Sequence, residues 1–308
     1  MFKSRRKFLA YLGAAGIPVT LGTGSLFLGS MKLEAHQTKV ATPRPETPPP
    51  TLITNTYKAP ELDIHNWDWQ IADNLAVAKK TNRERPADLI LHDHRIKTLK
   101  STVSRLKRLQ NHIGYGNFNI IGWDQSLKLA KRQSSIGAFE KAELDLIEEV
   151  FSSDADNMGF YGEKVVTQIS STIPRKEIKK IPGTGHYLFK GSSIKMYDKI
   201  RKDIGDDIVL TSGIRSVVKQ VYLFLNKATQ VGGNLSTASY SLAPPGHSFH
   251  AIGDFDVGKV NFGRRNFTAE FANTDEFKKL ADLGYIDIRY PENNPFGVRY
   301  EPWHIKVV

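Results

Sequence analysis

Apolar residues in the middle of the chain recur every three or four positions, which is the spacing of an amphipathic helix. Residues 96–109 follow this spacing and carry Lys and Arg between the apolar positions. The same pattern predicts helices over 124–133 and 138–151, and the glycine-interrupted stretch 111–122 between them reads as a loop. The sequence therefore predicts a mainly helical region over residues 61–190.

From residue 191 to the C-terminus, stretches in which apolar residues recur with helical spacing are followed by stretches in which they alternate every two residues. The alternation of apolar and acidic residues over 252–257 is typical of a strand, and it places Asp254 and Asp256 on one face. Because strands and helices are segregated in this way, we expect an α+β fold with a small antiparallel sheet and flanking helices over 191–308. The other elements predicted here are helices over 194–204, 215–227 and 275–283, strands over 207–212 and 298–308, and a Gly/Ser-rich loop over 232–245.

The first thirty residues have the pattern of an export signal. Four of the residues at positions 3–7 are basic, and an uncharged, mostly apolar run follows to position 28. The stretch Ser4-Arg5-Arg6-Lys7 resembles the twin-arginine signature. A membrane anchor with basic flanks is the alternative, because the apolar run is long and carries no clean Ala-x-Ala cleavage site. We expect export to the periplasm or cell envelope. Residues 31–60, rich in Pro and Thr, predict an extended linker.

Composition narrows the chemistry that this chain can support. The 308 residues include no cysteine, which excludes disulfides and thiolate metal sites and leaves His and carboxylates as zinc ligands. A formal net charge of +11 predicts attraction to polyanions such as membrane lipid and acidic wall polymers. We expect no nucleic-acid partner, because the basic residues are scattered and no nucleic-acid-binding motif accompanies them.

Two C-terminal segments place histidines beside carboxylates. Residues 245–258 contain His250 with Asp254 and Asp256, and residues 300–307 contain Glu301 three positions before His304. Two aspartates on one face repel each other unless a cation lies beside them. A catalytic zinc ion uses three such ligands and keeps a position for water, and a further carboxylate can take the proton of that water. His186, just ahead of this region, could also line a cleft.

These residues carry a resemblance to a known family. Ser248-Phe-His250-Ala-Ile-Gly253, with Asp256, followed by Glu301-Pro-Trp-His304, resembles the paired signature of the zinc D-alanyl-D-alanine carboxypeptidases and dipeptidases. These are the cell-wall and vancomycin-resistance metallopeptidases, whose fold is shared with the hedgehog signalling domain. The stretch Ser-Gly-Ile-Arg-Ser at 212–216, with a Gln five residues after the Arg, resembles a third family segment. The three pieces occur in the family's order over the last 110 residues or so.

The resemblance implies a role for each matching residue. Asp256 comes six residues after His250, whereas the family usually places its aspartate seven residues after the first His. Asp254 is therefore an alternative ligand, although we favour Asp256 because Val257 and Gly258 continue much as the family's strand does. The implied roles are zinc ligation by His250, Asp256 and His304, general-base catalysis by Glu301, binding of the substrate's carbonyl oxygen or carboxylate by Arg215, and lining of the substrate cleft by Gln220 and Ser248.

The resemblance implies an exported zinc D,D-carboxypeptidase that removes the terminal D-Ala from peptidoglycan stem peptides. An endopeptidase that cuts within the stem or cross-bridge is a close variant. A non-catalytic wall-binding module of the same fold is the other alternative, but a structural zinc site would need neither Glu301 nor Arg215. The helical region over 61–190 is either a separate wall-binding domain or a cap packed on the catalytic unit.

Overall fold

The computed structural model describes residues 87–285 and 287–308. The predicted signal or anchor over 1–30 and the linker over 31–60 lie outside these residues and stay predictions. Within the described part of the chain, no helix has both the length and the apolar character that crossing a bilayer requires.

Helices dominate the first half of the described chain, as predicted. α2 (Asp93–Ile113), α4 (Trp123–Arg132) and α5 (Lys141–Ser152) fall on the three stretches with helical spacing. The predicted loop between the first two is wrong in part. Gly114, with a positive φ of 82°, ends α2, and the short helix α3 (Tyr115–Phe118) begins directly after it. Phe118 is fully buried, so packing of this one side chain holds a helical turn that the local pattern does not indicate.

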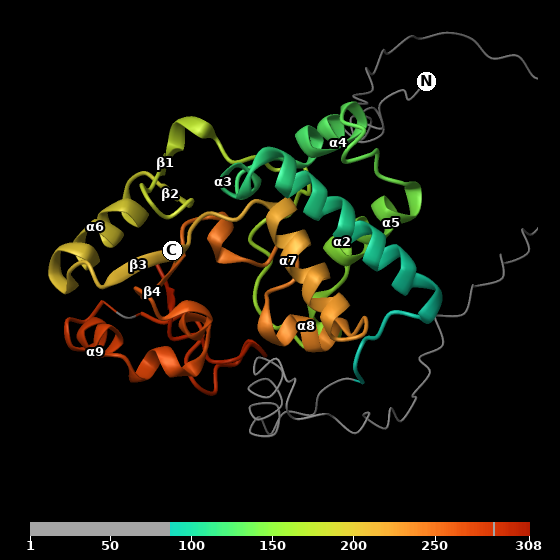
Figure 1. Cartoon of the computed structure of the whole chain (residues 1–308). Helices are drawn as coiled ribbons and strands as arrows, with labels where there is room; N and C mark the ends of the chain where they lie inside the picture. The colour runs from blue at the N-terminus through green and yellow to red at the C-terminus, as the bar shows by residue number, and fades with distance from the viewer. Residues whose placement is uncertain (1–86, 286) are drawn as a thin grey trace, which may run out of the picture. The chain divides into compact units, whose positions relative to one another are not determined.

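The helical region shares its hydrophobic core with residues beyond 190. α7 (Val217–Gln230) lies alongside α2 (Figure 1), and α8 (Leu235–Ser241) packs on α7. One cluster of buried side chains runs from Leu91 to Ala238 across these helices. The described part of the region therefore shares one core with α7 and α8. Its role as a separate wall-binding domain or as a cap on the catalytic unit stays a prediction. Where one domain ends and the next begins stays a prediction.

The predicted loop over 232–245 is wrong, because it contains α8. The side chain of Asn234 caps this helix by accepting a hydrogen bond from the backbone N–H of Thr237. Leu235 and Ala238, three positions apart, are buried against the core. The Gly and Ser content of the stretch predicts a loop, but tertiary packing stabilises a helix there.

The second half is built on a small antiparallel sheet, which confirms the α+β class. Its order is β3 (Ile208–Ser212), β4 (Phe255–Lys259), β5 (His304–Ile305). α6 (Ser192–Ile204) contacts β3 and α9 (Asp275–Asp282). The described residues also form five short 3₁₀ helices: η2 (Ala155–Met158), η3 (Arg175–Glu177), η4 (Phe249–Ala251), η5 (Gly263–Phe267) and η6 (Ala269–Asn273).

One strand prediction and one prediction of helical structure need correction. The closing strand expected over 298–308 is reduced to β5, since Pro302 has no backbone N–H to donate and the chain turns before His304. A hairpin of β1 (Ile178–Lys180) and β2 (Tyr187–Phe189) lies in the region predicted to be mainly helical. Its strands are three residues long, too short for two-residue alternation to reveal them.

Candidate metal centre

The register of the three-stranded sheet brings the predicted metal ligands together. Asp256 on β4 lies opposite His304 on β5 and opposite Ser212 on β3. His250 enters from η4, and its ring centroid lies 4.8 Å from that of His304. One ligand atom from each of His250, Asp256 and His304 lies within 4.8 Å of the others, and all three side chains are buried. We call these three residues the His–Asp–His group.

Each imidazole of this group makes a hydrogen bond on the side away from Asp256. Nδ1 of His250 lies 2.8 Å from the carbonyl oxygen of Gly213, which can only accept, so Nδ1 carries the proton. This leaves Nε2, 3.1 Å from Oδ1 of Asp256, with a free lone pair in the neutral ring. His304 has the opposite arrangement, since its Nε2 lies 3.0 Å from Oδ2 of Asp254 and its Nδ1 lies 3.6 Å from Oδ1 of Asp256.

Asp254 lies just before β4 and supports His304 from outside the group. Its carboxylate accepts a hydrogen bond from Nε of Arg289 at 2.5 Å and another from the backbone N–H of Val307 at 2.8 Å. Asp256, not Asp254, is thus the aspartate that lies between the two imidazoles. Sequence reasoning missed Arg289, which no motif marks. The only signal that could have found it is the need of a buried Asp254 for a cation.

Arg215 holds the other oxygen of Asp256. Its Nη2 donates to Oδ2 of Asp256 at 2.6 Å, and its Nε donates to Oγ of Ser212 at 3.0 Å. The Arg215 backbone N–H also donates to the His250 carbonyl at 3.2 Å, which joins the start of α7 to η4. Oδ1 of Asp256 therefore faces the imidazoles while Oδ2 faces the guanidinium.

Glu301 lies at the edge of the His–Asp–His group. Its Oε2 is 3.4 Å from Nδ1 of His304, and its backbone N–H donates to the Tyr290 carbonyl at 3.0 Å, which fixes the turn before β5. The ring of Tyr290 packs edge-on against His304, with centroids 5.2 Å apart. The glutamate thus points at the same nitrogen that faces Asp256.

The structure does not bring the two remaining predicted residues into hydrogen-bond contact with this group. Gln220 is buried on α7, and its amide nitrogen donates to the Ala243 carbonyl at 2.5 Å. Ser248 is buried directly before η4, where its carbonyl oxygen accepts a hydrogen bond from the backbone N–H of Ala251. Their roles in lining a substrate cleft stay predictions.

Burial and charge shape the pKa values around the group. Burial by itself would raise the pKa of Asp256, but the charges of His250 and Arg215 outweigh it and lower that pKa to about 2. Burial lowers the pKa of His250, and Arg215 lowers it further. Burial opposes protonation of His304 as well, but Asp254 and Glu301 together raise its pKa to about 9. The pKa of His304 is thus raised by the carboxylates around it, whereas the pKa of His250 is lowered by burial and by the Arg215 guanidinium.

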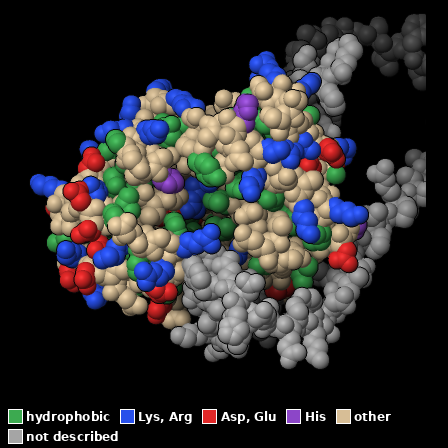
Figure 2. Space-filling view, in the orientation of Figure 1, with side chains coloured by type: hydrophobic (Ala, Val, Ile, Leu, Met, Phe, Trp, Pro, Cys, Tyr) green, Lys and Arg blue, Asp and Glu red, His purple; other side chains and the backbone are tan. Residues whose placement is uncertain are grey.

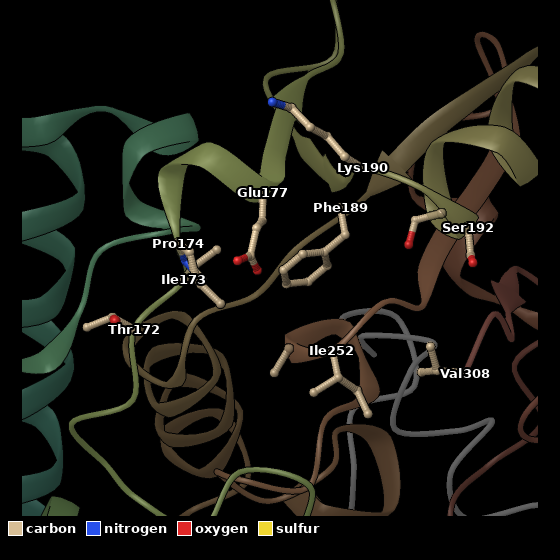
Figure 3. A pocket seen from close by; sticks show the side chains of 11 residues that line it. Thr172, Ile173, Pro174, Glu177, Phe189, Lys190, Ser192, Ile252 and Val308 are labelled. Carbon is tan, nitrogen blue, oxygen red and sulfur yellow. The ribbon is translucent and has the colours of Figure 1, made fainter.

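A pocket of about 390 Å³ reaches the end of η4 at Ala251, and no member of the His–Asp–His group lines it. Phe189 and Ile252 face each other across it, with Val308 at one end (Figure 3). It adjoins the site through Ala251 and Ile252, the two residues after His250, and through Val308, whose backbone N–H donates to Oδ1 of Asp254 at 3.3 Å. The pocket thus lies beside residues that support the His–Asp–His group and not at the group itself.

Comparison with known proteins confirms the resemblance. Residues 192–308 match the family model of VanY, D-alanyl-D-alanine carboxypeptidase. This segment contains the whole His–Asp–His group, Arg215 and Glu301. No curated protein matches the chain.

Two solved structures are also similar to part of the chain. One is the LdcB LD-carboxypeptidase, whose structure reveals the molecular basis of peptidoglycan recognition. It is 28% identical with a TM-score of 0.35, and the match covers 42% of this chain and 62% of that one. The other is VanYB in complex with D-Alanine-D-Alanine; it is 23% identical, with a TM-score of 0.35, and the match covers 44% of this chain and 81% of that one. The chain thus covers less than two thirds of the first of these proteins.

Proposed function

We propose that this chain, whose residues 192–308 match the VanY D-alanyl-D-alanine carboxypeptidase family, is a zinc-dependent peptidase acting on peptidoglycan stem peptides. The observation that carries the proposal is the convergence of His250, Asp256 and His304 beside Glu301. Three potential ligands and one further carboxylate are what metal-assisted amide hydrolysis requires.

The donor set fits zinc. Two imidazole nitrogens and one carboxylate oxygen are ligands that zinc accepts, and three of them leave a coordination position open. The nitrogens of the two rings that face away from Asp256 are held by the Gly213 carbonyl and by Asp254. Such outer hydrogen bonds orient metal-binding imidazoles and fix their tautomers.

The residues around the group supply the rest of the chemistry. A zinc ion, when bound here, would lower the pKa of water to about 7 and polarise a peptide carbonyl. The Glu301 carboxylate, at the edge of the group, accepts the proton of the attacking water and returns it to the leaving amine. The Arg215 guanidinium keeps Asp256 ionised and supplies fixed positive charge next to the carbonyl that is cleaved.

The specific reaction proposed is removal of the terminal D-Ala from stem peptides. Endopeptidase cleavage within the stem or cross-bridge uses the same machinery and remains the second candidate. Export through the N-terminal segment, cleaved or kept as an anchor, is part of the proposal, because peptidoglycan lies outside the cytoplasm. It rests on the basic and apolar pattern of residues 1–30.

Mass spectrometry of digested muropeptides tests the function. The purified protein, loaded with zinc, is incubated with pentapeptide muropeptides and with cross-linked dimers. Loss of one alanine from the pentapeptide is the expected result, whereas cleavage of dimers alone would identify an endopeptidase. A chelated sample serves as the control. A protein that binds no zinc, or that leaves both substrates intact when zinc is bound, overturns the proposal and favours a non-catalytic module.

A further inference from the structure

The resemblance assigns Arg215 to the carbonyl or the carboxylate of the substrate, but its side chain already forms hydrogen bonds within the protein. Its Nη2 and Nε donate to Asp256 and Ser212, and its side chain is only 14% exposed. An arginine held this way is positioned to act at the metal centre. A free substrate carboxylate therefore needs another cation.

Lys219, one helical turn after Arg215 on α7, is such a cation. Its ammonium donates to Oε1 of Gln110 at 3.2 Å and lies over the rings of Phe118 and Tyr222, at 5.5 and 5.8 Å from their centroids. None of these contacts within the described residues is a carboxylate. Burial lowers the pKa of Lys219 to about 8, with a further contribution from Arg215. The ammonium is thus a largely dehydrated charge without a counter-ion among residues 87–285 and 287–308.

Asn119 and Tyr187 link His186 to the segment that carries Arg215 and the start of α7. The amide of the buried Asn119 donates to Nδ1 of His186 at 3.3 Å, and the Asn119 carbonyl accepts from the Ser216 N–H at 2.8 Å. The next residue, Tyr187, accepts a hydrogen bond from the Ile214 N–H, and a Cβ at Gly213 would collide with the same Tyr187 oxygen. This close approach, which only glycine permits, holds β2 against the start of α7.

The charges around the metal centre act on the ring of His186. Arg215, Lys219, Asp256 and His250 all lie close enough to act on it electrostatically, and burial with the two cations lowers its pKa to about 4. Because Nδ1 accepts from Asn119, Nε2 of the neutral ring carries the proton and is a donor. Figure 2 shows a hollow near the centre of the visible face, with Lys or Arg and His side chains at its edge.

We propose that Lys219 binds the terminal carboxylate of the peptide substrate, with Nε2–H of His186 as a neutral donor beside it. This inference rests on the proposed peptidase function and assigns Lys219 as a residue that determines specificity for free C-termini. Arg215 then acts on the scissile carbonyl alone. A peptide whose terminal carboxylate is replaced by an amide offers Lys219 no charge and binds more weakly.

Calorimetry on a variant that cannot turn over the peptide tests the inference. Glu301→Gln protein is titrated with an N-acetylated Lys-D-Ala-D-Ala peptide and with the same peptide amidated at its C-terminus. We expect the acid to bind roughly tenfold to a hundredfold more tightly, as for a hydrogen-bonded charge pair. Adding Lys219→Met should abolish this preference, and Lys219→Arg should retain part of it. Lys131→Met, on the exposed end of α4, removes the same charge and should preserve the preference.

The outcomes separate this inference from the proposed function. Equal affinity for acid and amide, no binding of either, or an unchanged preference after Lys219→Met each overturn the role of Lys219. None of these results bears on whether the wild-type protein hydrolyses muropeptides. Conversely, a wild-type protein that releases no alanine contradicts the proposed function, even if the acid preference and its dependence on Lys219 are present.

Discussion

His304 donates from Nε2 to Oδ2 of Asp254 at 3.0 Å, while Nδ1 of the same ring faces Asp256. Asp254 is itself held by Arg289 and by the backbone N–H of Val307. The imidazole that the structure places in the His–Asp–His group is therefore oriented by a buried carboxylate. Asp254, the alternative ligand on sequence grounds, therefore orients a ligand candidate instead of lying between the imidazoles.

Asp254→Asn should weaken zinc binding without abolishing it. The amide keeps the shape of the carboxylate but removes the charge that orients His304 and raises its basicity. Loss of such an outer partner typically costs tenfold to a hundredfold in metal affinity, roughly. Competition with a chromophoric chelator measures the change. Asp256→Asn is the comparison and should lose more zinc affinity, because Asp256 lies between both imidazoles. Equal zinc affinities of the wild type and Asp254→Asn would contradict this arrangement.

Glu301→Gln should abolish hydrolysis and retain zinc. The amide cannot accept a proton from water, and general-base catalysis is typically worth about 10²–10⁴ in rate. Alanine release from a D-Ala-D-Ala peptide is the measurement, with metal content determined on the same sample. Full activity in the variant would show that Glu301 is not the base, and loss of metal would show that it acts as a ligand.

Arg215→Lys should reduce the catalytic rate more than the binding of substrate. The guanidinium contacts Asp256 and Ser212 at once, and a lysine ammonium lacks the fork to replace both contacts. Removing a fixed charge of this kind costs roughly 10²–10³ in kcat. Steady-state kinetics separates kcat from KM. A change confined to KM would instead assign Arg215 to ground-state binding.

Glu143→Ala should destabilise the helical region. Oε2 and Oε1 of Glu143 accept from Nε and Nη2 of Arg105 at 2.6 and 3.2 Å, and the carboxylate is 1% exposed. Breaking a buried pair typically costs about 3–5 kcal/mol. Denaturant unfolding measures the loss. Asp145→Asn, which removes an exposed i,i+4 pair with Lys141 on the same helix, should cost at most about 1 kcal/mol.

The same pair predicts how the stability depends on pH. Burial by itself would raise the pKa of Glu143, but its hydrogen bonds to Arg105, to the Glu140 backbone and to Ser101 lower it below the ordinary value of 4.5. Because the pKa is lower in the folded state, the contribution is complete above pH 4.5 and is lost as the pH falls through the folded-state value. The stability of Glu143→Ala should therefore fall less steeply in acid than that of the wild type.

Much of the fold and the site could be predicted from local patterns. Helical spacing located α2, α4, α5, α6, α7 and α9 to within a few residues, because each buries one stripe of side chains. The absence of cysteine and the two segments that place histidines beside carboxylates indicated the residue types of the candidate metal centre, and the resemblance implied which of them act as ligands. These features lie within single segments, so the linear order of residues suffices to reveal them.

The tertiary structure decided which of these residues meet and what each one contacts. Asp256 and His304 are neighbours only because β4 and β5 pair in one register, and a shift of one residue would turn the side chains of a strand to its other face. Contacts between distant segments also decide three other features: Arg215 pairs with Asp256, Asp254 lies outside the His–Asp–His group, and Asn119 links His186 to the start of α7. Such pairings are set by packing of the whole core, and no local periodicity records them.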